Sequence, residues 1–170
     1  RPYCSRICCG AAIKNALKIK ELNPKANVYV LYKDIRTYSF SEEFYTEARE
    51  KGVIFIRYDD DNKPLITQES GELNAEVYDP ILGERILIKP SQVVLSAAVI
   101  PGGNEDISLL LKVPLNSDGF FQEAHVKLRP VDFSTDGVYV CGLAHSPKTV
   151  EESISQAHAA AARAAIPLSR

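Results

Sequence analysis

The chain has 170 residues, of which 45% are hydrophobic and 25% charged, with a formal net charge of −2. This composition predicts a globular protein with an apolar core and excludes a disordered chain. The near-neutral charge, without a basic cluster, gives no attraction to nucleic acid or anionic lipid. No apolar run reaches the roughly 20 residues of a membrane helix, and the N-terminus lacks a signal peptide's layout. We therefore expect a cytoplasmic protein that binds no nucleic acid and inserts into no membrane.

Three of the four cysteines, Cys4, Cys8 and Cys9, lie within six residues. Thiols this close cannot connect distant parts of a fold, so the pattern favours a metal or redox role over a disulfide scaffold. Closely spaced thiolates are typical of iron-sulfur clusters, which take a further ligand from elsewhere. If Ser5 caps the helix that follows, Cys8 and Cys9 fall in its first turn, where the positive helix end stabilises thiolates. The pattern predicts a cluster with these three cysteines as ligands.

Two alternatives to this cluster stay open on spacing alone. A zinc ion would use the same thiolates, although two adjacent ligands are less usual in zinc ribbons. Alternatively, Cys9 packs with Ile13 on the apolar helix face, and Cys4 and Cys8 are incidental. Cys141 lies inside an apolar strand-like run, so we expect a buried small hydrophobe there and not the fourth ligand.

The first 60 residues alternate between helical and strand patterns. The predicted elements are a helix after the thiols that stops at Asn23-Pro24, a strand at 27–32, a helix at 39–52 capped by Ser39 or Ser41 and ended by Gly52, and a strand at 53–58. Such alternation implies a parallel sheet, and a parallel unit starts with a strand. Because no strand precedes the first helix and the chain begins with Arg1, we expect the first strand to lie in a longer parent protein.

From residue 63 to 99 the pattern changes to short strand-like runs separated by turn signals. The runs lie at 72–79, 84–90 and 91–99, with turns at Asp79-Pro80 and Leu82-Gly83. They predict an antiparallel meander.

The C-terminal part predicts a strand that ends in Gly142, a short loop and a helix in which Thr149 and Glu152 have capping-box spacing. Lys148 immediately precedes this helix. A helix N-terminus beside a lysine can stabilise negative charge, such as that of a reduced flavin. The alternative is an ordinary strand-turn-helix whose alanines only pack on a sheet. These alanines are Ala157, Ala161 and Ala164.

The two histidines near this region, His125 and His145, lack a serine or cysteine partner at a recognisable nucleophile elbow. A hydrolase triad is therefore unsupported. We expect both to be hydrogen-bonded structural or cofactor-rim residues, and the sequence assigns no catalytic residue.

Residues 3–24, 28–38 and 118–165 together resemble the A subunit of heterodisulfide reductase, a flavoprotein. The resemblance implies an α/β chain from a thioredoxin-reductase-like flavoprotein, in which an α/β domain is inserted into a FAD domain. Residues 1–99 would be the remainder of the inserted pyridine-nucleotide-like domain with the meander, and 100–170 the C-terminal part of the FAD domain. The family carries [4Fe-4S] clusters, one of them held by an upstream cysteine and a C-x3-C-C set. This maps Cys4, Cys8 and Cys9 onto three of its four ligands.

By the same resemblance, residues 142–148 lie where flavoprotein disulfide reductases have a glycine-aspartate pair that contacts the flavin ribityl chain. Leu143 replaces the acidic residue here, so backbone groups at Ala144 and Lys148 are the expected contacts. Lys14, one turn beyond the thiols, either faces the flavin ring and tunes its electronics or is a solvated lysine. The expected flavin-binding residues are Gly142, Leu143, Ala144, Lys148, Thr149 and Lys14.

The resemblance implies a cytoplasmic electron-transfer complex in which FAD accepts two electrons and passes single electrons to [4Fe-4S] clusters, in some members by bifurcation. The implied partners are other subunits of the complex and ferredoxin, hydrogenase or dehydrogenase electron donors; a homodimer is also compatible. Two alternatives are a docking module with a cysteine-bound zinc and a plain FAD/NAD(P)H disulfide oxidoreductase, whose redox-active cysteine pair is absent. We expect the 170-residue chain alone to be inactive, to bind FAD weakly and to hold no complete cluster.

Overall fold

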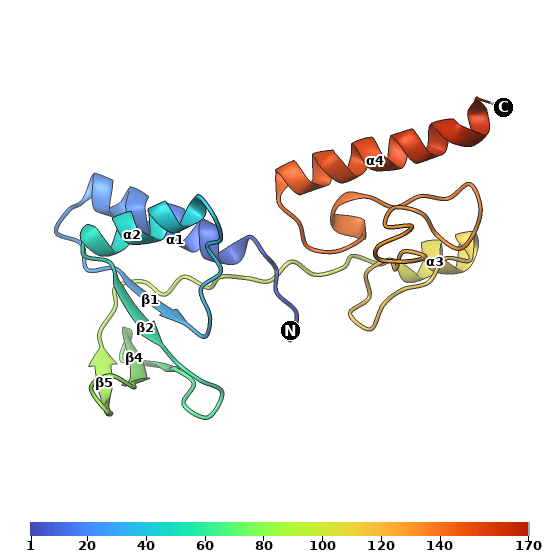
Figure 1. Cartoon of the computed structure of the whole chain (residues 1–170). Helices are drawn as coiled ribbons and strands as arrows, with labels where there is room; N and C mark the ends of the chain where they lie inside the picture. The colour runs from blue at the N-terminus through green and yellow to red at the C-terminus, as the bar shows by residue number, and fades with distance from the viewer. Residues whose placement is uncertain (170) are drawn as a thin grey trace. The chain divides into compact units, whose positions relative to one another are not determined.

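The computed structural model of the protein describes residues 1–169 (Figure 1). They form two compact units. Unit 1 combines Arg1–Ile7 with the chain from Ala98 onward, and unit 2 is Cys8–Ala97. Within the described residues, no helix is both long and apolar enough to cross a membrane.

Unit 2 begins with the alternation that the sequence predicts. Helix α1 (Cys8–Leu22) is followed by strand β1 (Tyr29–Tyr32), helix α2 (Ser41–Glu50) and strand β2 (Ile54–Arg57). The two strands pair in parallel, with Tyr29 opposite Ile54. This confirms the predicted parallel pair, because a parallel connection needs a crossover and α2 supplies it.

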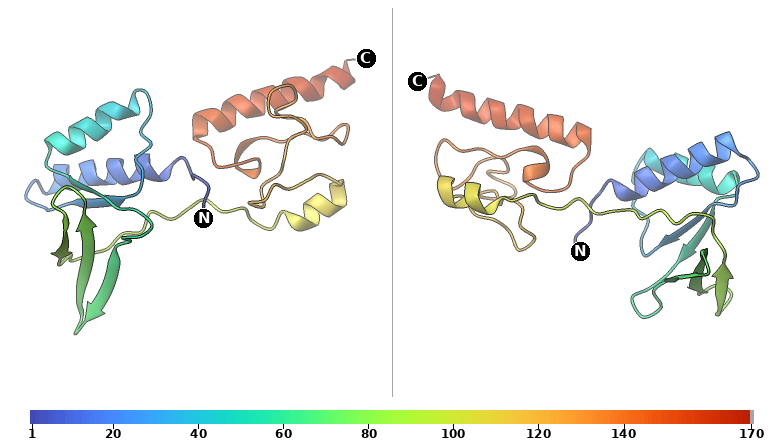
Figure 2. Two further views of the ribbon diagram at one scale, coloured as in Figure 1. Left: turned by 60° about the horizontal axis from the view of Figure 1, so that its bottom comes forward. Right: turned by 180° about the vertical axis from the view of Figure 1, so that it is seen from behind.

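The core of unit 2 lies between the helices and the parallel strands. Ile13 and Ala16 of α1 pack in one cluster with Ala48 of α2 and Val53. In both views of Figure 2 the two helices lie on the same side of the strands. Burial of these apolar residues, about 25 cal/mol for each Å² removed from water, holds the layers together.

The predicted stops of both helices are confirmed, but the predicted caps of α2 are wrong. Gly52, with φ of +76°, ends α2, and its amide donates to the Arg49 carbonyl. The N-cap residue is Phe40, which makes no side-chain capping bond, and Ser41 is already helical. Ser39 has φ of +56°, so it forms the turn before the helix and not its cap.

The meander is confirmed, with one strand misplaced. Strands β3 (Leu65–Glu69), β4 (Glu72–Asp79) and β5 (Glu84–Ile88) pair antiparallel in that order. The predicted strand at 91–99 is wrong, and β3 takes its place in the sheet. The two-residue turn Ser70-Gly71 explains this, because positive φ at both positions gives a tight hairpin that pairs β3 with β4.

Unit 1 contains helix α3 (Glu105–Leu111), the short 3-10 turn η1 (Gly142–Ala144) and helix α4 (Val150–Leu168). Between α3 and η1 the chain has irregular loops joined by isolated bridges. The predicted strand before Gly142 is wrong: one bridge joins Asp132 to Tyr139 in its place. The core cluster of this region is Val113, Phe121, Phe133 and Val140.

A buried ion pair ties α4 to these loops. The Asp132 carboxylate, only 4% exposed, accepts from Arg163 Nη2 at 2.9 Å and from its Nε at 3.1 Å. This forked geometry fixes the rotation of α4, so Ala160 is the buried alanine of the helix. The alanines predicted to pack lie elsewhere on the helix: Ala157 and Ala161 are exposed and Ala164 is half-buried.

The predicted α/β class, with a parallel pair and an antiparallel meander, is thus confirmed. The thioredoxin-reductase-like assignment is a finer statement that stays a prediction.

Candidate functional site

The three clustered thiols lie where the two units join along the chain. Cys8 and Cys9 begin α1, as predicted, and no acidic side chain occupies its first turn. All three thiols are half-buried, and none forms a disulfide. The positive end of α1 therefore favours the thiolate form of Cys8 and Cys9 without competition from a carboxylate.

Cys4 lies in a tight loop anchored on both sides to one residue of the same unit. The Tyr3 hydroxyl donates to the Val99 carbonyl at 2.7 Å, and the Val99 amide donates to the Ser5 hydroxyl at 2.9 Å. Ser5 is buried by this contact. Its predicted role as the cap of α1 is therefore wrong, because its hydroxyl is committed to Val99 and the helix starts three residues later.

The chemistry of this donor set fits part of a cluster site. The Arg6 amide, in a residue with φ of +62°, donates to Cys4 Sγ at 3.3 Å, the type of contact that stabilises a thiolate. Cys9 Sγ donates to the Asp34 carbonyl at 3.7 Å. In residues 1–169 no three histidine, cysteine or acidic side chains are grouped as a metal site. The three-cysteine ligand set therefore stays a prediction.

Cys141 is exposed, so its prediction as a buried hydrophobe is wrong. Its backbone is extended, with φ of −153°. Neighbouring side chains of an extended chain point to opposite sides, and Val140 takes the core side. The thiol of Cys141 consequently faces solvent.

The turn before α4 has the predicted capping box. The Glu152 amide donates to the Thr149 hydroxyl at 3.3 Å, and the Thr149 amide donates to the Glu152 carboxylate at 2.9 Å. These bonds lower the pKa of Glu152, with the bond from the Thr149 backbone as the largest cause. The cap fixes where α4 starts and leaves the first two helical amides pointing outward.

Lys148 and two exposed apolar residues surround this helix start. Burial is the main cause that lowers the pKa of Lys148, and the nearby charge of Arg6 lowers it further. Its ammonium donates to the Ser146 hydroxyl at 2.6 Å. Leu143 is 52% exposed and Val150 is 75% exposed. A cation beside exposed apolar side chains fits a flat ring with a negatively charged side, as the flavin prediction requires.

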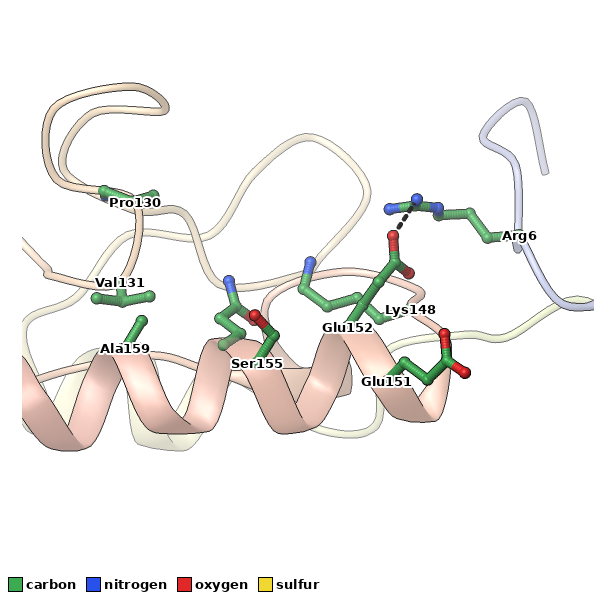
Figure 3. A pocket seen from close by; sticks show the side chains of 9 residues that line it. Arg6, Pro130, Val131, Lys148, Glu151, Glu152, Ser155 and Ala159 are labelled. Carbon is green, nitrogen blue, oxygen red and sulfur yellow. Dashed lines mark hydrogen bonds and ion pairs between the residues drawn. The ribbon is translucent and has the colours of Figure 1, made fainter. Parts of the chain in front are cut away.

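A pocket of about 500 Å³ opens beside the same helix start (Figure 3). Arg6 reaches it from the N-terminal loop and forms an ion pair with Glu152. Of the predicted flavin residues, only Lys148 lines this pocket. Its lining residues are Arg6, Pro130, Val131, Lys148, Glu151, Glu152, Ser155, Gln156 and Ala159. Sequence reasoning missed Arg6 here, because its partner Glu152 is 146 residues away.

His145 is hydrogen-bonded, as predicted. One ring nitrogen lies 2.7 Å from Glu123 Oε2, and the other lies 2.7 Å from Gln156 Nε2. Burial raises the pKa of Glu123, but the hydrogen bond from His145 and other contacts outweigh it, so the pKa is lowered overall. Sequence reasoning missed Glu123 and Gln156, since no local pattern marks them.

His125 and Lys14 complete the predicted residues. His125 Nδ1 accepts from the amides of Lys127 and Leu128 at 3.1 and 3.2 Å, which confirms a structural, hydrogen-bonded histidine. Lys14 is exposed on α1 in unit 2, whereas the turn at Gly142 belongs to unit 1. Its flavin contact stays a prediction.

Known proteins confirm the resemblance. The chain is 41% identical over 174 residues to the iron-sulfur A subunit of the CoB–CoM heterodisulfide reductase of Methanocaldococcus jannaschii. It is 42% identical over 173 residues to the A subunit of the H(2):CoB-CoM heterodisulfide,ferredoxin reductase of Methanothermobacter thermautotrophicus. Each match covers 99% of this chain and 26% of the relative. The A subunit of the ferredoxin:CoB-CoM heterodisulfide reductase of Methanosarcina acetivorans is 40% identical over 165 residues, 95% of this chain and 20% of that protein.

The chain therefore spans about a quarter of the length of these relatives. All three names describe part of a reductase. No protein-family model matches the chain.

Proposed function

We propose that this chain is part of the flavin and iron-sulfur electron-transfer subunit of a heterodisulfide-reductase-type complex. The observation that carries the proposal is the similarity to the A subunits of these reductases over nearly the whole chain. The half-buried thiols at the start of α1 and the lysine at the start of α4 support it.

Cys4, Cys8 and Cys9 are the proposed cluster ligands of this chain. The helix end holds Cys8 and Cys9 as thiolates, and the anchored loop presents Cys4 with an amide donor on its sulfur. A fourth ligand comes from outside these three. A bound [4Fe-4S] cluster would supply one-electron transfer, and the protein around it sets the potential through hydrogen bonds to sulfur and solvent access.

The turn from Gly142 to Thr149 and Lys14 are the proposed flavin contacts of this chain. A bound FAD would exchange electrons in pairs with a donor and singly with clusters. Lys148 stabilises negative charge on the ring, and the exposed side chain of Leu143 lies against its apolar part. Other subunits of the complex, ferredoxin and further electron donors in the cytoplasm are the proposed partners.

The test is cofactor analysis of the full-length gene product, purified without oxygen. We expect FAD, iron and acid-labile sulfide, and we expect Cys9→Ser to lose one cluster while FAD remains bound. Cys141→Ser is the matched control, because this exposed thiol lies outside the ligand set, and it should keep every cofactor. A colourless protein with stoichiometric zinc would overturn the proposal and favour a zinc docking module.

A further inference from the structure

A chain of hydrogen bonds connects the turn η1 to the start of an acidic loop, and its direction is fixed by the first donor. The Gly142 amide donates to Gln156 Oε1 at 2.8 Å. A backbone amide can only donate, so the oxygen of the Gln156 side chain must face Gly142. The amino group of the same side chain then faces His145 Nδ1 at 2.7 Å.

The direction continues through the imidazole. Because Gln156 donates to His145 Nδ1, this nitrogen accepts and carries no proton. The ring proton of His145 is therefore on Nε2, where it donates to the Glu123 carboxylate at 2.7 Å. His145 is held as the neutral Nε2–H tautomer, between a carboxylate on one side and an amide donor on the other.

The same bonds hold both ends of η1. At its first residue, Gly142 has φ of +67° and is bonded to α4 through Gln156. At its last residue, the Ala144 carbonyl accepts from the Phe121 amide at 3.0 Å. The exposed Leu143 lies between these two anchors. Both anchors are needed, since a three-residue turn has little internal stabilisation of its own.

We propose that Gln156 and His145 are positioning residues that set the backbone of the Gly142–Ala144 turn and thereby the surface that this turn presents to the flavin. The inference rests on the proposed function for its flavin part only. Neither side chain touches the cofactor; His145 orients Gln156, and Gln156 holds Gly142.

The first test measures the turn directly in the 170-residue chain by NMR. In Gln156→Leu we expect the Gly142 amide to exchange with solvent at least tenfold faster, because its acceptor is gone. Gln122→Leu is the matched control, since it makes the same change at an exposed side chain of the same unit. Gln156→Glu keeps an acceptor for Gly142, so it should restore slow exchange. It also replaces the amide donor by a carboxylate, so both nitrogens of His145 should become protonated.

The second test measures the FAD dissociation constant of the full-length gene product. We expect Gln156→Leu to weaken FAD at least tenfold and Gln122→Leu to leave it unchanged. Unchanged Gly142 exchange in Gln156→Leu, or a proton on His145 Nδ1 in the wild-type protein, would overturn the inference. Faster exchange with unchanged FAD affinity in both Gln156→Leu and Lys148→Gln would support the positioning role and contradict the flavin site of the proposed function.

Discussion

Thr149 and Glu152 cap each other at the start of α4, each accepting a hydrogen bond from the backbone amide of the other. This reciprocal pair also places Glu152 where Arg6 of the N-terminal loop can form an ion pair with it. One local motif thus determines both the start of the helix and its contact with residues near the other end of the chain.

Replacing Thr149 by alanine should therefore destabilise the protein by about 1 kcal/mol, the usual cost of a lost N-cap. Chemical denaturation followed by circular dichroism measures the loss. Thr149→Ser keeps the hydroxyl and should remain within a few tenths of a kcal/mol of the wild type. Equal stability of the alanine and serine variants would contradict the role of the cap.

The lowered pKa of Glu123 predicts a stability change in acid. Because the folded pKa lies below the ordinary value of 4.5, the stabilisation is fully present above pH 4.5 and is lost as the pH falls through the folded pKa. Glu123→Gln should be less stable than the wild type by about 1 kcal/mol at pH 7, with a smaller difference near pH 3. Urea denaturation across this range measures it. The exposed Asp136→Asn is the control; a similar pH dependence there would argue against the His145 contact as its source.

The Asp132–Arg163 pair should be among the costliest contacts of unit 1 to break. Asp132→Ala leaves the guanidinium without its forked acceptor and should cost about 3 kcal/mol. Arg163→Met leaves the buried carboxylate with Arg129, 3.6 Å away, as its remaining ion-pair partner among the described residues. The double variant should lose less than the sum of the two single losses. Additive losses would mean that the two side chains do not stabilise each other.

The 170-residue chain by itself should hold less than one complete [4Fe-4S] cluster. Its clustered cysteines supply three ligands, and Cys141, which faces solvent from another part of the chain, is not expected to be the fourth. Anaerobic reconstitution followed by iron and sulfide determination checks this. A full cluster per chain that disappears in Cys141→Ser would show that this thiol completes the set.

Nicotinamide cofactors should not bind at the start of α1. A pyrophosphate needs close approach to backbone amides, which glycines permit, but Cys8 and Cys9 occupy the first turn of the helix and Gly10 comes only after them. Thiolates there would also repel the phosphates. Calorimetric titration with NADH and NADPH should give no saturable binding at this turn. Binding that is lost on substitution of Arg6 or Cys8 would refute this expectation.

Several features of the protein could be predicted from its sequence because their signals are local. The stop of α1 before Asn23-Pro24 follows from the geometry of the residue before a proline. The capping box needs only residues three apart, Thr149 and Glu152. The parallel pairing of β1 and β2 follows from the order of elements, since a helix between two strands brings them back in the same direction.

Other features were decided by contacts between residues far apart in the chain. A serine two residues after Tyr3 has the composition of a helix cap, but the fold brings the Val99 amide to Ser5, 94 residues away in sequence, and the hydroxyl bonds there. Gln156 and His145 carry no signal in the sequence and become connected only when α4 packs beside η1. A short polar side chain bonds whichever partner the tertiary structure delivers within about 3 Å. Local spacing therefore determined where the elements lie, and packing determined which polar groups meet.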